Sequence, residues 1–243
     1  MLYLQRSNPQ LFGKPLLIIL MDQKEIVVSE DIRRVCPGFV GCAVYAEFKN
    51  SKRCDALWDE INASLNRYVS EYTTESIKEM PAIEATRTAY RRCGKDPSRY
   101  RPSGEALMRR VLKGKGLYQI DTAVDLINLA SILYGYSIGG FDYDKISGST
   151  ITLGIGKAGE PYTGIGRGEL NIEGLPVYRD SEGGIGTPTS DNERTKLGME
   201  SSRILAIVNG YDGNRKNVEQ TARLIQRLLK DYADSDGGTV QWF

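Results

Sequence analysis

The stretch of residues 186–195, which follows a run of glycines, is the most polar compact part of the sequence. In ten residues it supplies hydroxyl groups, carboxylates and a guanidinium, which are groups that line small-molecule pockets. The members that we single out are Thr187, Thr189, Ser190, Asp191 and Arg194. The same residue types also make turns and cap helices, so the pattern alone favours a structural role over a binding role.

The chain contains no histidine among its 243 residues. This absence removes Ser–His and Cys–His nucleophile pairs, and it removes the usual general base near neutral pH. The four cysteines lie at irregular spacings without a CxxC pair, which predicts reduced thiols rather than a zinc site. Because no acidic cluster has metal-binding spacing either, we expect no metal and no cofactor.

A second group of charged residues occupies residues 87–115, where ten basic side chains face only Asp96 and Glu105. The segment therefore carries a charge of +8, although the whole chain carries only +1. A basic patch on a nearly neutral protein is typical of a specific anionic partner. Its Arg99-Tyr100-Arg101 step suits phosphate contacts and base stacking, but a solvated helix face explains the same composition equally well.

Residues 154–159 match the pattern GxGxxG and follow an expected strand. A dinucleotide-binding loop would require a helix to begin at this point, with its N-terminus facing the pyrophosphate. The sequence instead continues with Glu160, Pro161 and Tyr162, which indicates a turn into another strand. We therefore predict a hairpin here and no nucleotide site.

Hydrophobic spacing and turn residues predict the elements that must position these groups. We expect strands at residues 25–28, 39–48, 150–153, 162–165, 175–178 and 204–208. Helices are expected at residues 53–79, 83–93, 102–113, 122–133 and 218–232. Asp121 should cap the helix at 122–133, and Ser98 or Ser103 the helix before it. This mixture predicts an α/β (α+β) fold.

Both ends of the chain carry separate expectations. Residues 1–24 read as an N-terminal extension from a misassigned start codon, with an N-terminal strand as the alternative. The apolar run at residues 16–20 is too short to span a bilayer and lacks a clear cleavage site, so we expect no membrane segment and a cytoplasmic location. Residues 234–243 are expected to form a frayed tail.

The run G-K-D-P-S-R-Y-R-P-S-G-E-A-L at residues 94–107 resembles a hallmark of B3/B4 modules. These modules are the editing and tRNA-binding part of phenylalanyl-tRNA synthetase β subunits, and they also occur as stand-alone proteins. The resemblance continues at residues 124–128, 141–146 and 184–194 and covers residues 81–233, with residues 25–80 as the amino-terminal α/β part of the same module. It implies a B3/B4-like fold with a central mixed sheet flanked by helices, and a pocket for the aminoacylated 3′ end of tRNA.

The resemblance also implies roles for individual residues. Asn128 matches a pocket asparagine, and Asp142 matches the aspartate of an H-A-F-D segment whose histidine falls on Gly139. The glutamate that recognises a tyrosine hydroxyl falls on Ile207, so the resemblance does not carry tyrosine specificity over to this chain. The expected catalytic residues are Asn128, Thr187, Thr189 and Asp191. The expected substrate contacts are Ser103, Glu105, Asp142, Ser190, Arg194 and Ile207, and the expected RNA contacts are Arg99, Arg101, Arg109 and Arg110.

Three functions follow from these observations. The leading hypothesis is a tRNA-binding protein that hydrolyses a mischarged aminoacyl-tRNA in trans, by means of a positioned water and hydrogen-bond donors rather than a protein nucleophile. The alternative is a non-catalytic pocket that binds a free amino acid or a similar metabolite. A third interpretation is a structural partner of another protein. The chain has no ATP-binding motif and no room for a synthetase core, so we do not expect it to charge tRNA by itself.

Overall fold

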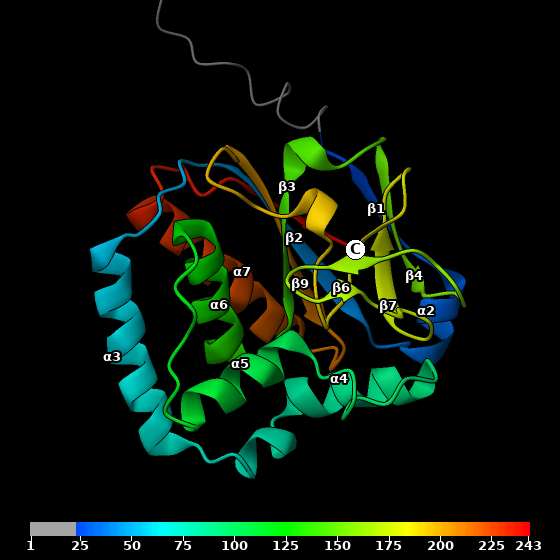
Figure 1. Ribbon diagram of the computed structural model, residues 1–243, viewed down its shortest axis with the longest axis horizontal. Coiled ribbons are helices and arrows are strands. Elements are labelled where there is room, and N and C mark those ends of the chain that lie inside the picture. Colours follow the sequence, from blue (N-terminus) through cyan, green and yellow to red (C-terminus); the bar gives the residue numbers. More distant parts are fainter. Residues whose placement is uncertain (1–22) are drawn as a thin grey trace, which may run out of the picture.

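Two four-stranded β-sheets, stacked face to face, form the centre of the computed structural model, which describes residues 23–243 (Figure 1). The central sheet is antiparallel throughout and has the order β10 (Thr239–Trp242), β2 (Val40–Glu47), β9 (Arg203–Gly210) and β3 (Ile138–Asp142). The second sheet is mixed and has the order β1 (Glu25–Val28), β4 (Thr150–Ile155), β7 (Pro176–Arg179) and β8 (Gly184–Gly186).

Strands β2 and β9 are buried on both faces, which explains why their sequences are almost continuously apolar. Side chains alternate between the two faces of a strand. In β9, Ile204, Ala206 and Val208 therefore pack into the helical core, whereas Leu205 and Ile207 pack against the second sheet. The β3 edge of this central sheet is the place where the candidate site forms.

Helices cover the face of the central sheet that the second sheet leaves open (Figure 1). Asp121 caps α6 by accepting the N–H of Val124, and Gly135 ends that helix at a φ of 81°, so the predicted cap is confirmed. Neither serine caps α5, because Pro102 occupies the cap position and Ser103 is the first helical residue. The α-helices are α2 (Glu30–Val35), α3 (Asp55–Glu71), α4 (Pro81–Arg92), α5 (Ser103–Leu112), α6 (Thr122–Tyr134) and α7 (Arg215–Tyr232).

Short elements fill the connections between these helices and strands. They are the 3₁₀ turns η1 (Ser76–Glu79), η2 (Tyr143–Lys145) and η3 (Glu193–Thr195), and the two-residue strands β5 (Thr163–Gly164) and β6 (Gly168–Glu169). The helix expected at residues 53–79 ends at Glu71 and resumes only as η1. Within residues 23–243, no helix has the length and apolar composition needed to cross a membrane.

The α+β class is confirmed, but the central sheet is antiparallel rather than mixed, and the layers also differ from the expectation. Helices cover only one face of the central sheet, and the mixed sheet covers the other face. The GxGxxG segment leaves β4 as a turn with no helix, but the predicted hairpin with the next strand is wrong. Strand β4 pairs with β7, and β5 pairs with β6.

The last ten residues are not a frayed tail. Residues 239–242 form β10, which pairs with β2 along the outer edge of the central sheet. Phe243 then packs near the rings of Phe39 and Tyr178, at centroid distances of 6.2 Å and 6.3 Å. The expected N-terminal extension, residues 1–24, falls almost wholly outside the described residues, whereas the strand expected at residues 25–28 is β1.

The Phe243 contacts predict that the C-terminus contributes to stability. Replacing Phe243 by Ala removes a ring from between Phe39 and Tyr178, and should lower the free energy of unfolding by about 2 kcal/mol in urea titrations. Val240→Ala, on an exposed side chain of β10, is the control and should change it by less than about 0.5 kcal/mol. Equal, negligible effects of both variants would contradict a docked C-terminus.

Candidate functional site

Strand β3 forms one edge of the central sheet, and the segment after β8 closes that edge. Asp191 pairs with Gly186 as an isolated bridge, and Phe141 pairs in the same way with Lys196. Between these two contacts the main-chain N–H of Gly140 donates to Oδ2 of Asp191 at 2.9 Å. The carboxylate of Asp191 therefore takes the hydrogen bond that a neighbouring strand would otherwise accept.

Glycines on both sides make room for this carboxylate. An ideal Cβ on Gly139 would lie 2.7 Å from the Phe141 ring and 3.5 Å from Oδ1 of Asp191. On Gly186 it would lie 2.4 Å from the same ring and 3.0 Å from the same oxygen. Phe141 is fully buried, so its ring cannot easily move away. We call Gly139, Gly140, Gly186 and Asp191 the glycine edge.

The protonation of Asp191 is set by its surroundings. Burial raises the pKa of its carboxyl group from the ordinary value to about 7, and the N–H of Gly140 opposes that shift. Within residues 23–243 no second hydrogen-bond donor and no cation reaches this carboxylate. Near neutral pH the side chain is therefore present in both protonation states, which is the condition for an effective general base.

The main chain next to Asp191 is held by its own hydrogen bonds. The Thr187 hydroxyl accepts the N–H groups of Thr189 and Ser190 and donates to the carbonyl oxygen of Ser190. The hydroxyl of Tyr162 donates to that same oxygen at 2.7 Å. These contacts fix the turn that aims the Asp191 carboxylate at β3.

The two polar motifs of the sequence meet in space. The Thr189 hydroxyl donates to the carbonyl oxygen of Tyr100 at 3.1 Å and bonds to the hydroxyl of Tyr90 at 2.9 Å. The N–H of Ser103 donates to the carbonyl oxygen of Pro188 at 2.7 Å. The arginine-containing segment before α5 therefore packs directly on the turn that leads to Asp191.

Both threonines of this turn are structural in the folded chain. Thr187 is 6% exposed and Thr189 is 2% exposed, and each hydroxyl is occupied by the bonds described above. The hydroxyl of Ser190 donates weakly to the carbonyl oxygen of Asp191 at 3.2 Å. Of the polar side chains expected in this loop, Asp191 alone presents an atom without an internal partner to the glycine edge.

Glu105 lies beneath the surface with its side chain 1% exposed. Its carboxylate pairs with Arg87 at 2.9 Å, with Arg109 at 2.8 Å and with Arg101 at 3.7 Å. A buried carboxylate needs such partners, because an unpaired one would pay a large desolvation cost. Glu105 therefore organises arginine side chains, and the structure leaves a substrate no access to it.

Three other expected substrate contacts also have partners within the protein. Asp142 is 3% exposed, accepts the Ser201 hydroxyl at 2.7 Å and pairs with Lys145. Ile207 is fully buried and lies opposite Gly139 in the central sheet. Arg194 pairs with Asp180 at 2.7 Å. In place of the expected contacts with a ligand, these side chains hold the turns and the core around the glycine edge.

The arginines expected to contact RNA differ in their availability. The side chain of Arg109 is only 16% exposed and is used by Glu105 and by the carbonyl oxygen of Thr74. The guanidinium of Arg110 lies 3.6 Å from the centroid of the Tyr118 ring. Arg99 and Arg101 remain exposed, directly before α5. Fewer positive charges of this segment are therefore exposed to solvent than its number of basic residues suggests.

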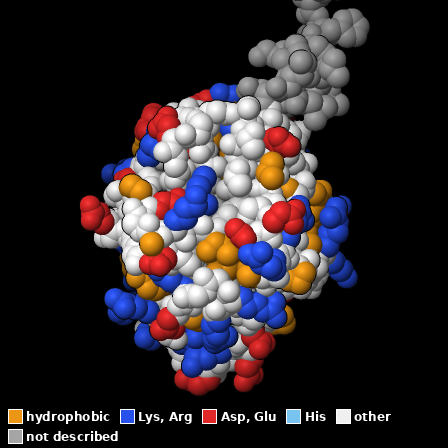
Figure 2. Space-filling view, turned by 90° about the vertical axis from the view of Figure 1, so that its right-hand side faces the viewer, with side chains coloured by type: hydrophobic (Ala, Val, Ile, Leu, Met, Phe, Trp, Pro, Cys, Tyr) orange, Lys and Arg blue, Asp and Glu red, His pale blue; other side chains and the backbone are white. Residues whose placement is uncertain are grey.

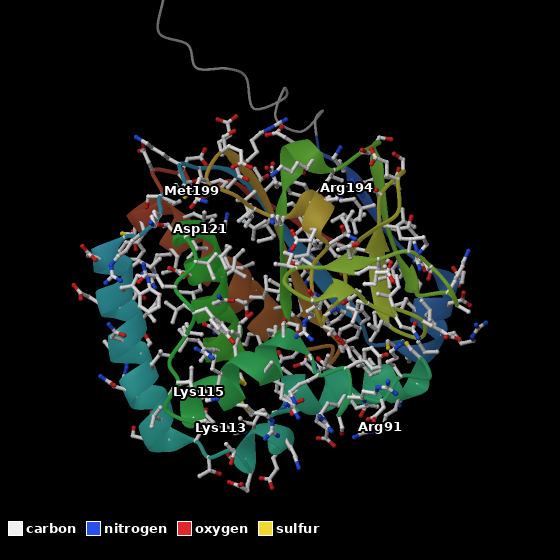
Figure 3. The ribbon with its side chains drawn as sticks, in the orientation of Figure 1. Arg91, Lys113, Lys115, Asp121, Arg194 and Met199 are labelled. Carbon is white, nitrogen blue, oxygen red and sulfur yellow. The ribbon has the colours of Figure 1, made fainter. Side chains whose placement is uncertain are left out.

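Three exposed basic residues of this segment lie in the same half of the molecule. Arg91 on α4 and Lys113 and Lys115 after α5 lie in the lower half of Figure 3, whereas Arg194 lies in the upper half. Figure 2 shows several Lys and Arg side chains on the lower part of the adjoining face, with acidic side chains at its lowest edge. The positive charge thus lies on the side of the molecule formed by α4 and α5.

Two further predicted residues keep free polar atoms. The side chains of Asn128 on α6 and Ser103 at the start of α5 are partly exposed and form no hydrogen bond with another residue in the range 23–243. Ile127, the neighbour of Asn128, packs on Gly140, where an ideal Cβ would lie 2.6 Å from its Cδ1 atom. The glycine edge is therefore the candidate site, and Asn128 and Ser103 are two further predicted residues whose polar atoms remain available.

Sequence reasoning missed the residues that shape this site without reacting. The signal for them was the adjacent pair Gly139-Gly140 inside a strand, because glycine in a strand often marks close approach by another group. All four cysteines are free thiols. In the described part of the chain, no group of three or more Cys, Asp or Glu side chains is placed to hold a metal ion.

Comparisons with known proteins give one matching family and two similar proteins. Residues 85–233 match the family model of the B3/4 domain. The chain is 31% identical over 106 residues to the phenylalanine–tRNA ligase beta subunit of Geobacter metallireducens, an alignment that covers 43% of this chain and only 13% of that relative. It also resembles an N-terminal fragment of the phenylalanyl-tRNA synthetase beta subunit from Pyrococcus horikoshii, at 14% identity and a TM-score of 0.46, over 90% of this chain and 51% of that one.

The raised pKa of Asp191 predicts a pH-dependent effect on stability. Since the folded-state pKa of about 7 exceeds the ordinary aspartate value, the folded protein holds this proton more tightly than the unfolded chain. Its contribution is most favourable at about pH 4 and is lost as the pH rises through 7. Asp191→Asn should therefore raise the free energy of unfolding at pH 8 by about 2 kcal/mol, with allowance for partial exposure, and by much less at pH 4.

Urea titrations at both pH values measure this difference. Asp31→Asn, on the exposed surface of α2, is the matched control and should have a small effect at either pH. An Asp191→Asn variant that is less stable than the wild type at pH 8 would contradict the burial of an uncompensated carboxylate.

The space at Gly139 predicts the outcome of placing a histidine at this position. Gly139→His would drive a side chain into the buried Phe141 ring and towards Asp191, and should lower the free energy of unfolding by about 3 kcal/mol or more. Gly38→Ala, where a Cβ meets nothing within 4 Å, should be close to neutral in the same thermal and urea titrations. A Gly139→His variant as stable as the wild type would show that this space is open.

Proposed function

The chain belongs to the B3/4 domain family, and from that premise we propose that it binds the aminoacylated 3′ end of tRNA and hydrolyses the ester of a mischarged species. One observation carries the proposal: Asp191 presents, at the glycine edge, a carboxyl group whose pKa is about 7. The chain spans 13% of the length of the phenylalanine–tRNA ligase beta subunit that it matches, so this activity is proposed for the domain alone.

The reaction needs a base, a water molecule and hydrogen-bond donors. Ionised Asp191 takes a proton from the water, whose oxygen attacks the carbonyl carbon of the ester. The Asn128 amide and the Ser103 hydroxyl, which are free of internal partners, donate to the oxyanion that forms. The carbon–oxygen bond to the ribose then breaks, and protonated Asp191 returns its proton to the leaving ribose oxygen. The products are the free amino acid and deacylated tRNA.

The surroundings of Asp191 account for the absence of histidine. A general base works best when its pKa lies near the ambient pH, and the pKa of an exposed aspartate lies well below neutral pH. Burial, with a single N–H donor and no nearby cation in the described part of the chain, raises the pKa of Asp191 to the range in which an imidazole titrates without any shift. The tight space between Gly139 and Phe141 gives a reason why a histidine is not found at that strand position.

Exposed arginines support the approach of a nucleic acid. Arg99 and Arg101 flank Tyr100, whose carbonyl oxygen accepts the hydroxyl of Thr189 in the turn before Asp191. Phosphates bound by these guanidinium groups would therefore lie near the segment that positions the carboxylate. Buried Lys95 steadies the arrangement, since its ammonium lies 3.8 Å from the centroid of the Tyr100 ring.

Deacylation of a panel of mischarged tRNAs by the purified protein tests the proposal. Asp191→Asn should lower kcat/KM by about 10²–10⁴-fold, as expected when a general base is removed, and Asn128→Ala should lower it by at least about tenfold. In the wild type the rate should rise with pH up to about 7 and level off above it, because only ionised Asp191 accepts the proton. Asp31→Asn should behave like the wild type.

A specific pattern of results would overturn the hydrolase. If no member of the panel is deacylated, while free amino acids still bind and Asp191→Asn abolishes that binding, the site is a non-catalytic amino acid pocket. If turnover occurs but survives in Asp191→Asn without a change in its pH profile, the reaction does not use this carboxylate.

A further inference from the structure

A pocket of about 380 Å³ opens between α4, the connection from α2 to β2, and the turn after β9. It shares no residue with the glycine edge. Its floor is made mainly of small or apolar residues, and its charged and polar members are Glu84, Thr88, Arg92, Tyr211 and Asp212. A volume of this size suits a ligand of amino acid or dipeptide dimensions.

Two opposite charges of the pocket are fixed in advance. The guanidinium of Arg92 donates to the carbonyl oxygen of Val35 at 3.0 Å, which holds it at the C-terminal end of α2. The carboxylate of Asp212 accepts the hydroxyl of fully buried Tyr136 at 3.0 Å and the N–H of Asn214 at 3.2 Å. A head group that carries an ammonium and a carboxylate would meet partners that need little reorganisation.

A third charge extends the pocket along α4. Glu84 precedes Arg92 by eight residues, which corresponds to about 12 Å along a helix. Ala85 and Ala89 line the pocket between them, and their small side chains leave room for an extended aliphatic chain. The three charged side chains of the wall therefore have a net charge of −1, and the carboxylate of Glu84 lies apart from the guanidinium of Arg92.

We propose that this pocket binds a free cationic amino acid of the lysine or arginine type. Arg92 would meet the α-carboxylate, Asp212 the α-ammonium, and Glu84 the charged end of the side chain, which crosses the surface of Ala85 and Ala89. A ligand with a net charge of +1 matches a wall with a net charge of −1. The assignment does not depend on the hydrolase function proposed for the glycine edge.

Calorimetric titration of the full-length protein with L-lysine tests this assignment against three matched probes. L-norleucine has the same length without the terminal ammonium, cadaverine lacks the carboxylate, and L-arginine has the alternative cationic group. L-lysine or L-arginine should bind saturably, and about tenfold or more tightly than norleucine and cadaverine. Glu84→Gln should remove the preference over norleucine, and Arg92→Gln should remove the preference over cadaverine.

Asp191→Asn separates this proposal from the previous one, because lysine binding should be unchanged in that variant. Glu84 is an exposed helical residue, so Glu84→Gln is expected to fold, and its thermal unfolding curve checks this. The proposal is overturned if lysine and arginine give no saturable heat, if they bind no better than norleucine, or if binding survives the double variant Glu84→Gln/Arg92→Gln. Loss of lysine binding in Asp191→Asn would also overturn it and place the ligand at the glycine edge.

Discussion

A single hydrogen bond, from the N–H of Gly140 to the carboxylate of Asp191, is the constraint on which the candidate site depends. It joins β3, at the edge of the central sheet, to the turn that follows β8 of the second sheet. This hydrogen bond requires two conditions. The strands must lack side chains where the Asp191 carboxylate lies, and the turn must be rigid enough to hold this carboxylate although it accepts only one hydrogen bond. Glycines at positions 139 and 186 meet the first condition. Main-chain bonds within the turn and from Tyr162 meet the second.

The contrast between two acidic residues, Glu105 and Asp191, shows how surroundings separate structural from chemical roles. Glu105 is surrounded by three guanidinium groups, and its carboxylate holds them in place through ion pairs. Among residues 23–243 Asp191 has no cation near it and only one N–H donor, so burial raises its pKa into the physiological range. An arrangement of this kind costs stability that other parts of the fold must supply, which is the usual relation between active groups and scaffold stability.

The sequence predicted what is local and missed what depends on distant partners. The cap at Asp121 and the left-handed end at Gly135 follow from near neighbours, and both were predictable. Strand β10 was not, because its strand character comes from pairing with β2, almost two hundred residues earlier. Asp191 was among the residues predicted for the site, and its carboxylate lies at the glycine edge. Thr187 and Thr189 were selected with it, because composition does not reveal that a turn's own main chain and Tyr100 occupy their hydroxyls.

Titration of the aspartate carboxyl carbons by ¹³C NMR, in selectively labelled protein, measures the central property of the site without assuming a substrate. The account predicts one carboxyl resonance with a midpoint near pH 7 that is missing from the spectrum of Asp191→Asn. If the resonance lost in that variant titrates near pH 4 instead, Asp191 is an ordinary hydrated carboxylate and the proposed base does not exist.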